Sequence, residues 1–260
     1  MKKWAFICIS ALVIQACNQE AKQEEKAGTD SSTVITAPES TLAPNTLSEA
    51  EKAEGWVLLF DGQSKNGWHV WQAKSDGSSW KVADGTLYFD TTGKAEDKTN
   101  GGDLVTDSAF ENYHLSLEWK ISPKGNSGVV FGVKDDKKYE HTWHTGMEMQ
   151  VLDNDGHPDG KIIKHRAGNL YDLIASSSEP VKPVGEWNRA EVKWVNGKLD
   201  LFLNGENVVS TQTGDENWKK LVAGSKFREM NDFGKFTSGK IALQDHGDPV
   251  WYRNIRIRKL

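Results

Sequence analysis

The chain has few cysteines and no strong excess of either charge. Both cysteines, Cys8 and Cys17, lie near the N-terminus, so residues 55–260 contain no disulfide, thiolate nucleophile or cysteine metal ligand. Residues 55–260 hold 27 basic and 29 acidic side chains. A nucleic-acid-binding domain would carry a basic stripe, so this balance argues against nucleic acid as a partner. The sequence also lacks an apolar run of about 20 residues, which excludes a polytopic membrane protein.

The first residues have the pattern of an export signal. Lys2 and Lys3 precede an apolar segment over residues 4–14, which is too short to span a bilayer as a helix. Ala16 stands directly before Cys17, an arrangement that resembles a bacterial lipobox. We predict a lipoprotein signal peptide over residues 1–17 and a lipid on Cys17. The alternative is an ordinary cleaved signal peptide. A lipid there would anchor the chain to the outer membrane of a Gram-negative bacterium, on its periplasmic or its cell-surface side.

Residues 18–54 contain eight acidic side chains, three lysines and almost no large apolar side chains. Such a segment cannot bury enough apolar surface to offset the entropy lost on ordering. We therefore predict a disordered acidic linker over residues 18–54, followed by one domain over residues 55–260.

Alternation of apolar and polar residues predicts β-strands in this domain. It is clearest over residues 113–121, 147–151, 190–194 and 199–203. Asn196-Gly197 and Asn204-Gly205 are typical of two-residue hairpin turns. Further strands are expected at 56–60, 80–82, 86–90, 103–106, 128–133, 240–245 and 250–258. One helix is expected at 215–221 and a turn near 225–230. So many short strands favour an all-β, two-sheet jelly-roll sandwich with one or two short helices.

Ten of the eleven tryptophans follow residue 55. Trp119 and Trp194 lie on the apolar side of their strands, so we expect them in the core. Trp143 lies near a turn. It either packs locally or offers the flat face on which a sugar ring stacks.

Polar residues concentrate in three stretches, at 141–157, 165–172 and 244–247, which hold five of the seven histidines. Glu148 and Gln150 share one strand face, which is either a concave groove or a solvated surface. Each of the other stretches has a structural alternative. Asp153 could complete a polar turn, His165-Arg166 could be a surface pair, and the segment from Gln244 to His246 could be a strand end satisfied by backbone groups.

Two familiar chemistries fit this pattern incompletely. Ordinary glycoside hydrolysis needs two carboxyl groups, but Gln150 stands where a second acid would follow Glu148, and Asp153 has the opposite parity. A second carboxyl would have to come from another strand. Metal binding is the other option, because several side chains are suitable ligands, although their spacing matches no standard zinc motif. These side chains are His141, His144, Glu148, His157 and His165.

An ordered series of motifs resembles a known family. The motifs are Gly55–Gly62 with Gly67-Trp68, Glu118–Ser122 with Gly125–Gly128, Gly146–Asp153, Ala167–Leu173, Gly185–Asn188, Asn204-Gly205, Ser225–Phe227, Ala242–Gly247 and Arg253–Ile255. They resemble the 3-keto-disaccharide hydrolase family, formerly a domain of unknown function, over about residues 54–260. Asn169 stands where that pattern has a small residue.

The resemblance implies a concanavalin A-like jelly roll that acts on 3-keto-glucosides or 3-keto-disaccharides, supplied by an upstream sugar 3-oxidoreductase. A ketone at C3 acidifies the proton on C2. A base can remove that proton, the enolate can expel the aglycone from C1, and water can add afterwards. This chemistry needs one base, an electrophile at the ketone oxygen and an acid for the leaving oxygen.

Roles for individual residues follow from that resemblance. Glu148 or His165 would be the base. Arg166, Lys226 or a divalent metal ion held by His144 and Glu148 would stabilise the oxyanion. Asp245 or His246 would serve the leaving group. Gln150, Asp153, Tyr171, Gln244 and Trp143 would bind the sugar. The alternatives are a lectin-like surface lipoprotein that binds carbohydrate without cleaving it, and a structural envelope protein.

Overall fold

The computed structural model describes residues 1, 42–92 and 100–260. The predicted signal peptide beyond Met1, Cys17, and residues 18–41 of the predicted linker lie outside the described residues. The described residues from 42 onward belong to one compact unit. Within the described part of the chain, no helix is both long and apolar enough to cross a membrane.

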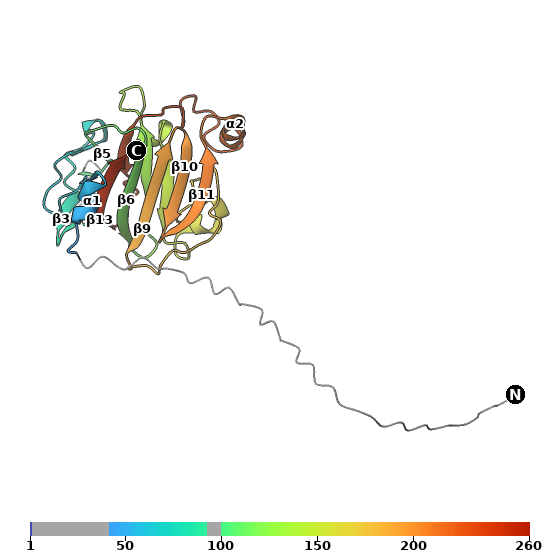
Figure 1. Ribbon diagram of the computed structural model, residues 1–260, viewed down its shortest axis with the longest axis horizontal. Coiled ribbons are helices and arrows are strands. Elements are labelled where there is room, and N and C mark those ends of the chain that lie inside the picture. The colour runs from blue at the N-terminus through green and yellow to red at the C-terminus, as the bar shows by residue number, and fades with distance from the viewer. Residues whose placement is uncertain (2–41, 93–99) are drawn as a thin grey trace, which may run out of the picture. The chain divides into compact units, whose positions relative to one another are not determined.

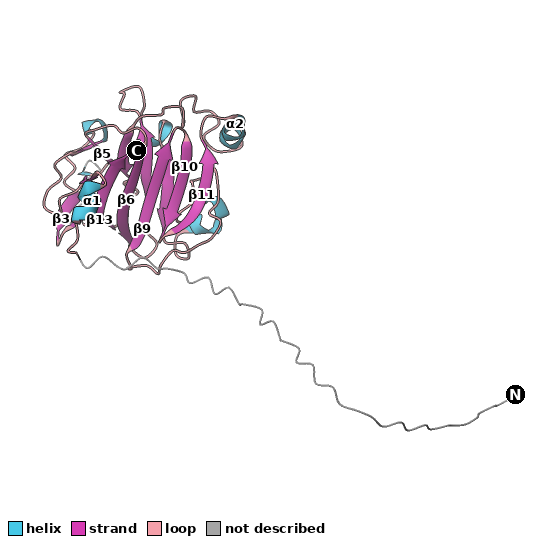
Figure 2. Cartoon of the chain, viewed as in Figure 1, coloured by secondary structure: helices cyan, strands magenta, loops and turns pink. Residues whose placement is uncertain are grey.

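Two antiparallel sheets make up this unit, and strands dominate the view in Figure 2. The larger sheet has the order β11-β10-β9-β6-β13-β4-β3, with β1 also paired to β13 (Figure 1). Its strands are β1 (Trp56–Leu58), β3 (Trp80–Ala83), β4 (Thr86–Phe89), β6 (Tyr113–Ile121), β9 (Asn188–Val195), β10 (Lys198–Leu203), β11 (Glu206–Gln212) and β13 (Val250–Lys259). The smaller sheet has the order β2-β5-β12-β7-β8. Its strands are β2 (Trp68–Val70), β5 (Leu104–Thr106), β7 (Asn126–Val133), β8 (Met147–Leu152) and β12 (Lys240–Leu243).

The main hydrophobic core contains apolar side chains from both sheets. Leu115 and Leu117 of β6 and Met147 and Met149 of β8 are all buried in it. Period-two alternation therefore sends every second side chain of these strands into the core. Trp119 and Trp194 are 1% and 3% exposed, which confirms their predicted place. The two-sheet, all-β prediction is confirmed.

The hairpin turn at Asn196-Gly197 and the start of the predicted helix also lie where the sequence predicted them. Asn196 and Gly197 have φ values of 49° and 79° and join β9 to β10. This left-handed pair matches the right-handed twist of the flanking strands. The predicted helix is α2 (Glu216–Ala223), and the side chain of Asp215 accepts a hydrogen bond from the Trp218 N–H at 2.7 Å. An N-cap aspartate of this kind fixes where a helix begins.

Part of the predicted linker is folded, which corrects the boundary at residue 55. Helix α1 (Glu49–Ala53) begins with a capping box between Ser48 and Glu51. Upstream of it, the Asn45 N–H donates to Asn254 Oδ1 at 2.6 Å, and the Asn254 N–H donates to Asn45 Oδ1 at 2.8 Å. This reciprocal pair joins the segment to β13. Composition suggested a linker because few of these side chains are apolar, but polar contacts order them.

Other differences are smaller. The strand predicted at 56–60 ends at Leu58, and β2 was not expected because three residues are too few for a visible alternation. The loops also contain short 3-10 turns. They are η1 (Trp71–Ala73), η3 (Thr142–His144), η4 (Pro158–Lys161) and η5 (Ile163–His165).

The face of the smaller sheet that points away from the main core carries a second apolar cluster. It contains Val105, Val130 and Ala242 from β5, β7 and β12, packed with Trp71 and Tyr139 from loops. These strand residues alternate with neighbours that belong to the main core, such as Leu104 and Val129. Loop residues therefore fold over this outer face, and they supply much of the wall of the site described next.

Candidate active site

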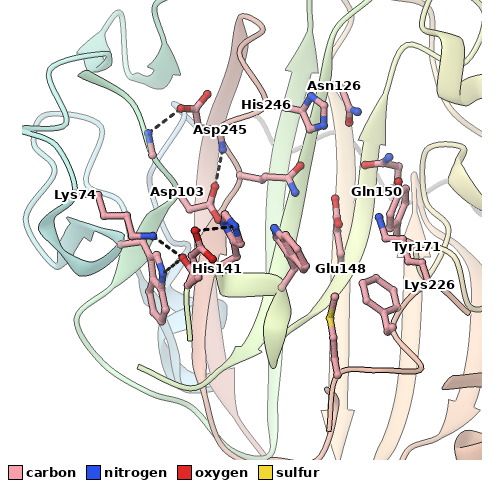
Figure 3. A pocket seen from close by; sticks show the side chains of 17 residues that line it. Lys74, Asp103, Asn126, His141, Glu148, Gln150, Tyr171, Lys226, Asp245 and His246 are labelled. Atoms are coloured by element: carbon pink, nitrogen blue, oxygen red, sulfur yellow. Dashed lines mark hydrogen bonds and ion pairs between the residues drawn. The ribbon is translucent and has the colours of Figure 1, made fainter. Parts of the chain in front are cut away.

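A cavity of about 580 Å³ lies on the outer face of the smaller sheet. Small-molecule sites commonly have this size. Its lining comes from β7, β8 and the loops around them: Trp71, Lys74, Gly102, Asp103, Asn126, Glu140, His141, Trp143, Glu148, Gln150, Tyr171, Lys226, Phe227, Met230, Gln244, Asp245 and His246. Glu148 lies near the middle of this group in Figure 3, with Lys226, Tyr171 and Gln150 on one side and Asp103, His141 and Lys74 on the other.

Strand β8 carries Glu148 and Gln150 on the cavity side, whereas Met147 and Met149 enter the core. The predicted shared face is therefore confirmed. Gly128 lies opposite Gln150 on β7, and a Cβ at residue 128 would come within 2.1 Å of Glu148 Oε1 and 2.9 Å of its Cγ. Any other residue would force the Glu148 side chain to move. Gly128 is thus what allows this carboxyl group to lie across the neighbouring strand.

Glu148 is only 6% exposed. Burial raises the pKa of its carboxyl group to about 8, the Lys226 ammonium works in the opposite direction, and Asp103 and Asp159 raise the pKa further. A buried carboxyl group loses the hydration that stabilises its charge, so the neutral form is favoured. Among the described residues no side chain hydrogen bonds to this carboxyl group. It is therefore available to exchange a proton with a bound molecule.

An irregular segment extends the sheet beyond β8 and brings Tyr171 to the cavity. Met149 and Leu170 form an isolated bridge, and the Tyr171 N–H donates to the Glu148 carbonyl at 3.0 Å. Lys226 enters from the turn after α2, with its Nζ 4.0 Å from the centroid of the Tyr171 ring. Desolvation lowers the pKa of Lys226 while Glu148 raises it. The Lys226 ammonium thus lies over an aromatic face and shares the cavity with the Glu148 carboxyl group.

Asp103 supplies a second carboxyl group, partly buried, on the other side of Glu148. It accepts hydrogen bonds from the Thr142 hydroxyl and, at 3.0 Å, from the Asp245 N–H. Burial raises the pKa of Asp103 to about 6, and these hydrogen bonds oppose the rise. Two carboxyl groups, one on β8 and one directly before β5, therefore line one cavity, an arrangement that the spacing of acids along the chain did not reveal.

The predicted sugar-binding and leaving-group residues have different surroundings. The Trp143 ring stacks on His141, with centroids 4.6 Å apart and planes 7° apart, and both line the cavity. His246 is exposed and also lines it. The side chain of Asp245 accepts the N–H groups of Gly102 and Gly247 at 2.7 and 2.9 Å. Those bonds give Asp245 a role in holding its loop, although it belongs to the cavity wall.

His165 does not line the cavity, which corrects its prediction as a base. It lies behind Tyr171, with ring centroids 4.3 Å apart. Its Nε2 is 3.0 Å from Asp172 Oδ1, and its Nδ1 is 3.4 Å from Asp159 Oδ2. A histidine in this place can reach a substrate only through its neighbours.

Arg166, Asp153 and His144 are also absent from the cavity wall. Arg166 forms a bidentate ion pair with Glu179, at 2.5 and 2.7 Å. Asp153 accepts the N–H groups of Lys124 and Gly156 at 2.7 and 2.9 Å. Both residues therefore tie loops together. Asp153 completes a polar turn, as its structural alternative anticipated, whereas His165 is buried and does not form a surface pair with Arg166. Over residues 42–92 and 100–260, no set of three His, Cys, Asp or Glu side chains is placed to hold a metal ion. His144 and Glu148 have no such third partner there.

Several lining residues were not predicted. Trp71, Lys74 and Asp103 are far from the polar stretches in sequence, and Asn126 stands in a Gly-Asn-Ser-Gly motif that reads as a turn. Phe227 and Met230 follow α2. The only signal that could have found Asp103 is an acid directly before a buried strand. Asn169, the departure from the family pattern, is buried, and its Oδ1 accepts the Ser176 N–H at 2.8 Å.

Comparison with known proteins identifies relatives over nearly the whole chain. Residues 55–258 match the family described as 3-keto-alpha-glucoside-1,2-lyase-like domain. The chain is 33% identical over 279 aligned positions to a 3-keto-disaccharide hydrolase of Bacteroides thetaiotaomicron, covering 97% of this chain and 96% of that protein.

Solved structures agree. A candidate glycosyl hydrolase of Parabacteroides distasonis is 33% identical, with a TM-score of 0.75 over 84% of this chain and all (100%) of that chain. A second from the same organism is 26% identical, with a TM-score of 0.60 over 79% of this chain and 99% of that one. The chain therefore belongs to the family of 3-keto-α-glucoside-1,2-lyase-like domains.

Proposed function

We propose that the protein is a hydrolase that cleaves the glycosidic bond of 3-keto-glucosides or 3-keto-disaccharides. The family and the named activity of the Bacteroides relative support the substrate class. The observation that carries the mechanism is the buried Glu148 carboxyl group, with a pKa raised to about 8, facing the same cavity as Lys226. A general base is most effective when its pKa is close to the operating pH.

The proposed reaction begins at C2 of the keto sugar. The Glu148 carboxylate takes the C2 proton, and the electron pair of that C–H bond moves toward C3 to form an enolate. The enolate then restores the C3 ketone, forms a C1–C2 double bond and breaks the bond from C1 to the aglycone oxygen, which takes up a proton. Water adds to C1, and C2 regains a proton. The sum is hydrolysis, with no change of oxidation state.

Each step needs a group that the cavity offers. Lys226 is the cation for the enolate oxygen, because developing negative charge is stabilised best by a donor already in place. His246 and Asp103 are the two candidates for protonating the leaving oxygen, from the exposed rim and from the buried wall respectively. Trp143, Gln150 and Gln244 line the remaining wall, where sugar rings and hydroxyl groups would bind.

The second carboxyl group gives one specific alternative. Asp103 and Glu148 are a pair of acids in one cavity, and ordinary glycoside hydrolysis requires such a pair. That mechanism would cleave an unoxidised glucoside. The proton-abstraction mechanism would not, because without the C3 ketone the C2 proton is not acidic.

Product release from a 3-keto-glucoside and from its unoxidised parent separates these mechanisms. We expect cleavage of the keto compound alone, and a turnover at least about 100-fold lower in Glu148→Gln, the usual lower size of a general-base contribution. Parallel reactions with a chelator test the metal requirement. Cleavage of the parent compound would favour the two-carboxylate mechanism. Binding of either sugar without cleavage of either would favour the lectin-like alternative.

We also propose a cellular context. The lipobox-like sequence before Cys17 supports a lipid anchor in the outer membrane. A C3 ketone does not occur in ordinary glucosides, so an oxidoreductase that oxidises the sugar at C3 must act before this enzyme. The link to that enzyme is through the substrate and needs no physical complex.

A further inference from the structure

A buried histidine outside the cavity lies against two aspartates, each of which forms a hydrogen bond with a residue of the cavity wall. His165 Nε2 forms a hydrogen bond of 3.0 Å with Asp172 Oδ1. Its buried Nδ1 makes no hydrogen bond within the described residues and lies at an ion-pair distance of 3.4 Å from Asp159 Oδ2. The side chains of both aspartates are partly buried. We call Asp159, His165 and Asp172 the histidine bridge.

Each end of the histidine bridge holds one residue of the cavity wall. Asp172 Oδ2 accepts a hydrogen bond from the backbone N–H of Lys226 at 2.7 Å. Asp159 Oδ2 accepts the Tyr171 hydroxyl at 3.2 Å. The Lys226 ammonium in turn lies 4.0 Å from the Tyr171 ring centroid. Both the backbone of Lys226 and the aromatic ring beneath its ammonium group are therefore fixed by the same three side chains.

We propose that His165 is a positioning residue, which keeps the Lys226 ammonium over the Tyr171 ring, in the cavity that the Glu148 carboxyl group also lines, by lying between Asp159 and Asp172. For catalysis this proposal rests on the proposed function, because the pair would supply the base and the cation. The placement itself is a property of the free protein and needs no substrate. Proximity of a cation favours the carboxylate over the neutral acid. A displaced Lys226 would therefore leave Glu148 harder to ionise.

The charged groups around Glu148 and Lys226 determine how the pKa of Glu148 should respond to loss of His165. Lys226 lowers the pKa of Glu148, whereas Asp103 and Asp159 raise it. Removing His165 could thus act on Glu148 in two ways: through a displaced Lys226, or directly through an Asp159 that has lost its partner. Only the first depends on Lys226, so a double-mutant cycle separates them.

The experiment is a titration of the ligand-free protein labelled with ¹³C at glutamate carboxyl groups, with the Glu148 signal assigned from its loss in Glu148→Gln. The variants are His165→Phe, Lys226→Met and both together. Phenylalanine keeps a ring against Tyr171 and removes both nitrogen contacts. We expect each single variant to raise the pKa of Glu148 by about 1, the lower end of the effect of a close opposite charge. The double variant should match Lys226→Met.

Three further measurements complete the test. His165→Gln retains a side-chain N–H for Asp172 and should restore part of the wild-type pKa. His114→Phe is the matched control, because His114 also pairs with a carboxyl group, Glu191 at 2.7 Å, but does so on the larger sheet. It should leave the Glu148 titration unchanged. Melting curves of every variant identify any that fails to fold, in which case His165→Gln and Asp172→Asn carry the test.

An unchanged Glu148 pKa in folded His165→Phe would overturn the proposal. So would a rise in the double variant that equals the sum of the two single rises, because that result assigns the effect to Asp159. Neither readout involves turnover. Failure of the protein to cleave 3-keto sugars would therefore count against the proposed function and leave the positioning role to be judged by the titration.

Discussion

At the scale of single residues, Glu148 is a carboxyl group placed where its charged form is poorly solvated. Its folded pKa of about 8 lies above the ordinary value of 4.5. The folded state therefore binds this proton more tightly than the unfolded state does. The stability that results is complete below about pH 4.5 and is lost as the pH rises through about 8. A site that is useful for proton transfer thus costs stability at alkaline pH.

Replacing Glu148 by glutamine should reverse this cost. Glu148→Gln cannot ionise, so we expect it to be more stable than the wild type at pH 9, by on the order of a few kcal/mol, with the gain shrinking toward pH 4.5. Urea unfolding of both proteins at pH 5 and pH 9 measures it. Glu186→Gln changes an exposed carboxyl group and serves as the control. An equal gain at both pH values would show that packing, and not ionisation, is responsible.

At the scale of elements, residues 45–54, which precede β1, form hydrogen bonds and ion pairs with β13. Asn45 pairs with Asn254, which has a φ of 53° at an irregular point of β13. Farther along, Glu51 and Glu54 form ion pairs with Arg256 and Arg258 at 2.6 and 2.7 Å. Exposed ion pairs contribute little, but the Asn45 bonds satisfy backbone and side-chain groups that are partly buried.

A chain that begins at residue 55 should consequently be less stable than one that begins at residue 42. Loss of the Asn45 hydrogen bonds costs roughly 1–3 kcal/mol, and at this chain length each kcal/mol lowers Tm by about 2–4 °C. Thermal melting of the two truncated proteins measures the difference. Asn45→Ala in the longer protein should reproduce much of it, while Thr46→Ala, at an exposed neighbour, should not. Equal melting temperatures for the two truncations would contradict this role.

Strand prediction worked where alternation was long enough to be seen. Residues 113–121 were predicted and form β6 with the same bounds, because nine alternating residues leave one register that buries an apolar face. The three residues of β2 carry no comparable pattern. Helix α1 was missed because its stability comes from capping and contacts to β13, and none of its residues is buried.

At the scale of the whole molecule, the lipid anchor that we propose at Cys17 predicts where the protein is found after cell fractionation. We expect the wild-type chain, expressed in a Gram-negative host, to remain in the membrane fraction at high salt and to be released by detergent, since acyl burial is insensitive to salt. Cys17→Ala should move the protein to the soluble fraction. Cys8→Ala, in the apolar part of the predicted signal, is the matched control and should stay membrane-bound. Fractionation followed by immunoblotting gives the result, and membrane retention of Cys17→Ala would disprove the anchor.

The sequence alone was enough to determine the class of fold, the hairpin turns and the common face of Glu148 and Gln150. Those features depend on period-two alternation and on turn residues, which are local properties of the chain. Which residues line the cavity was decided by tertiary structure. Pairing of β5 with β12, and of β12 with β7, brings Asp103 to the sheet face that holds Glu148. The same packing leaves His165 behind Tyr171. Chemical type and spacing could not distinguish these two residues, because only the assembled sheet and its covering loops set which side chain meets the cavity.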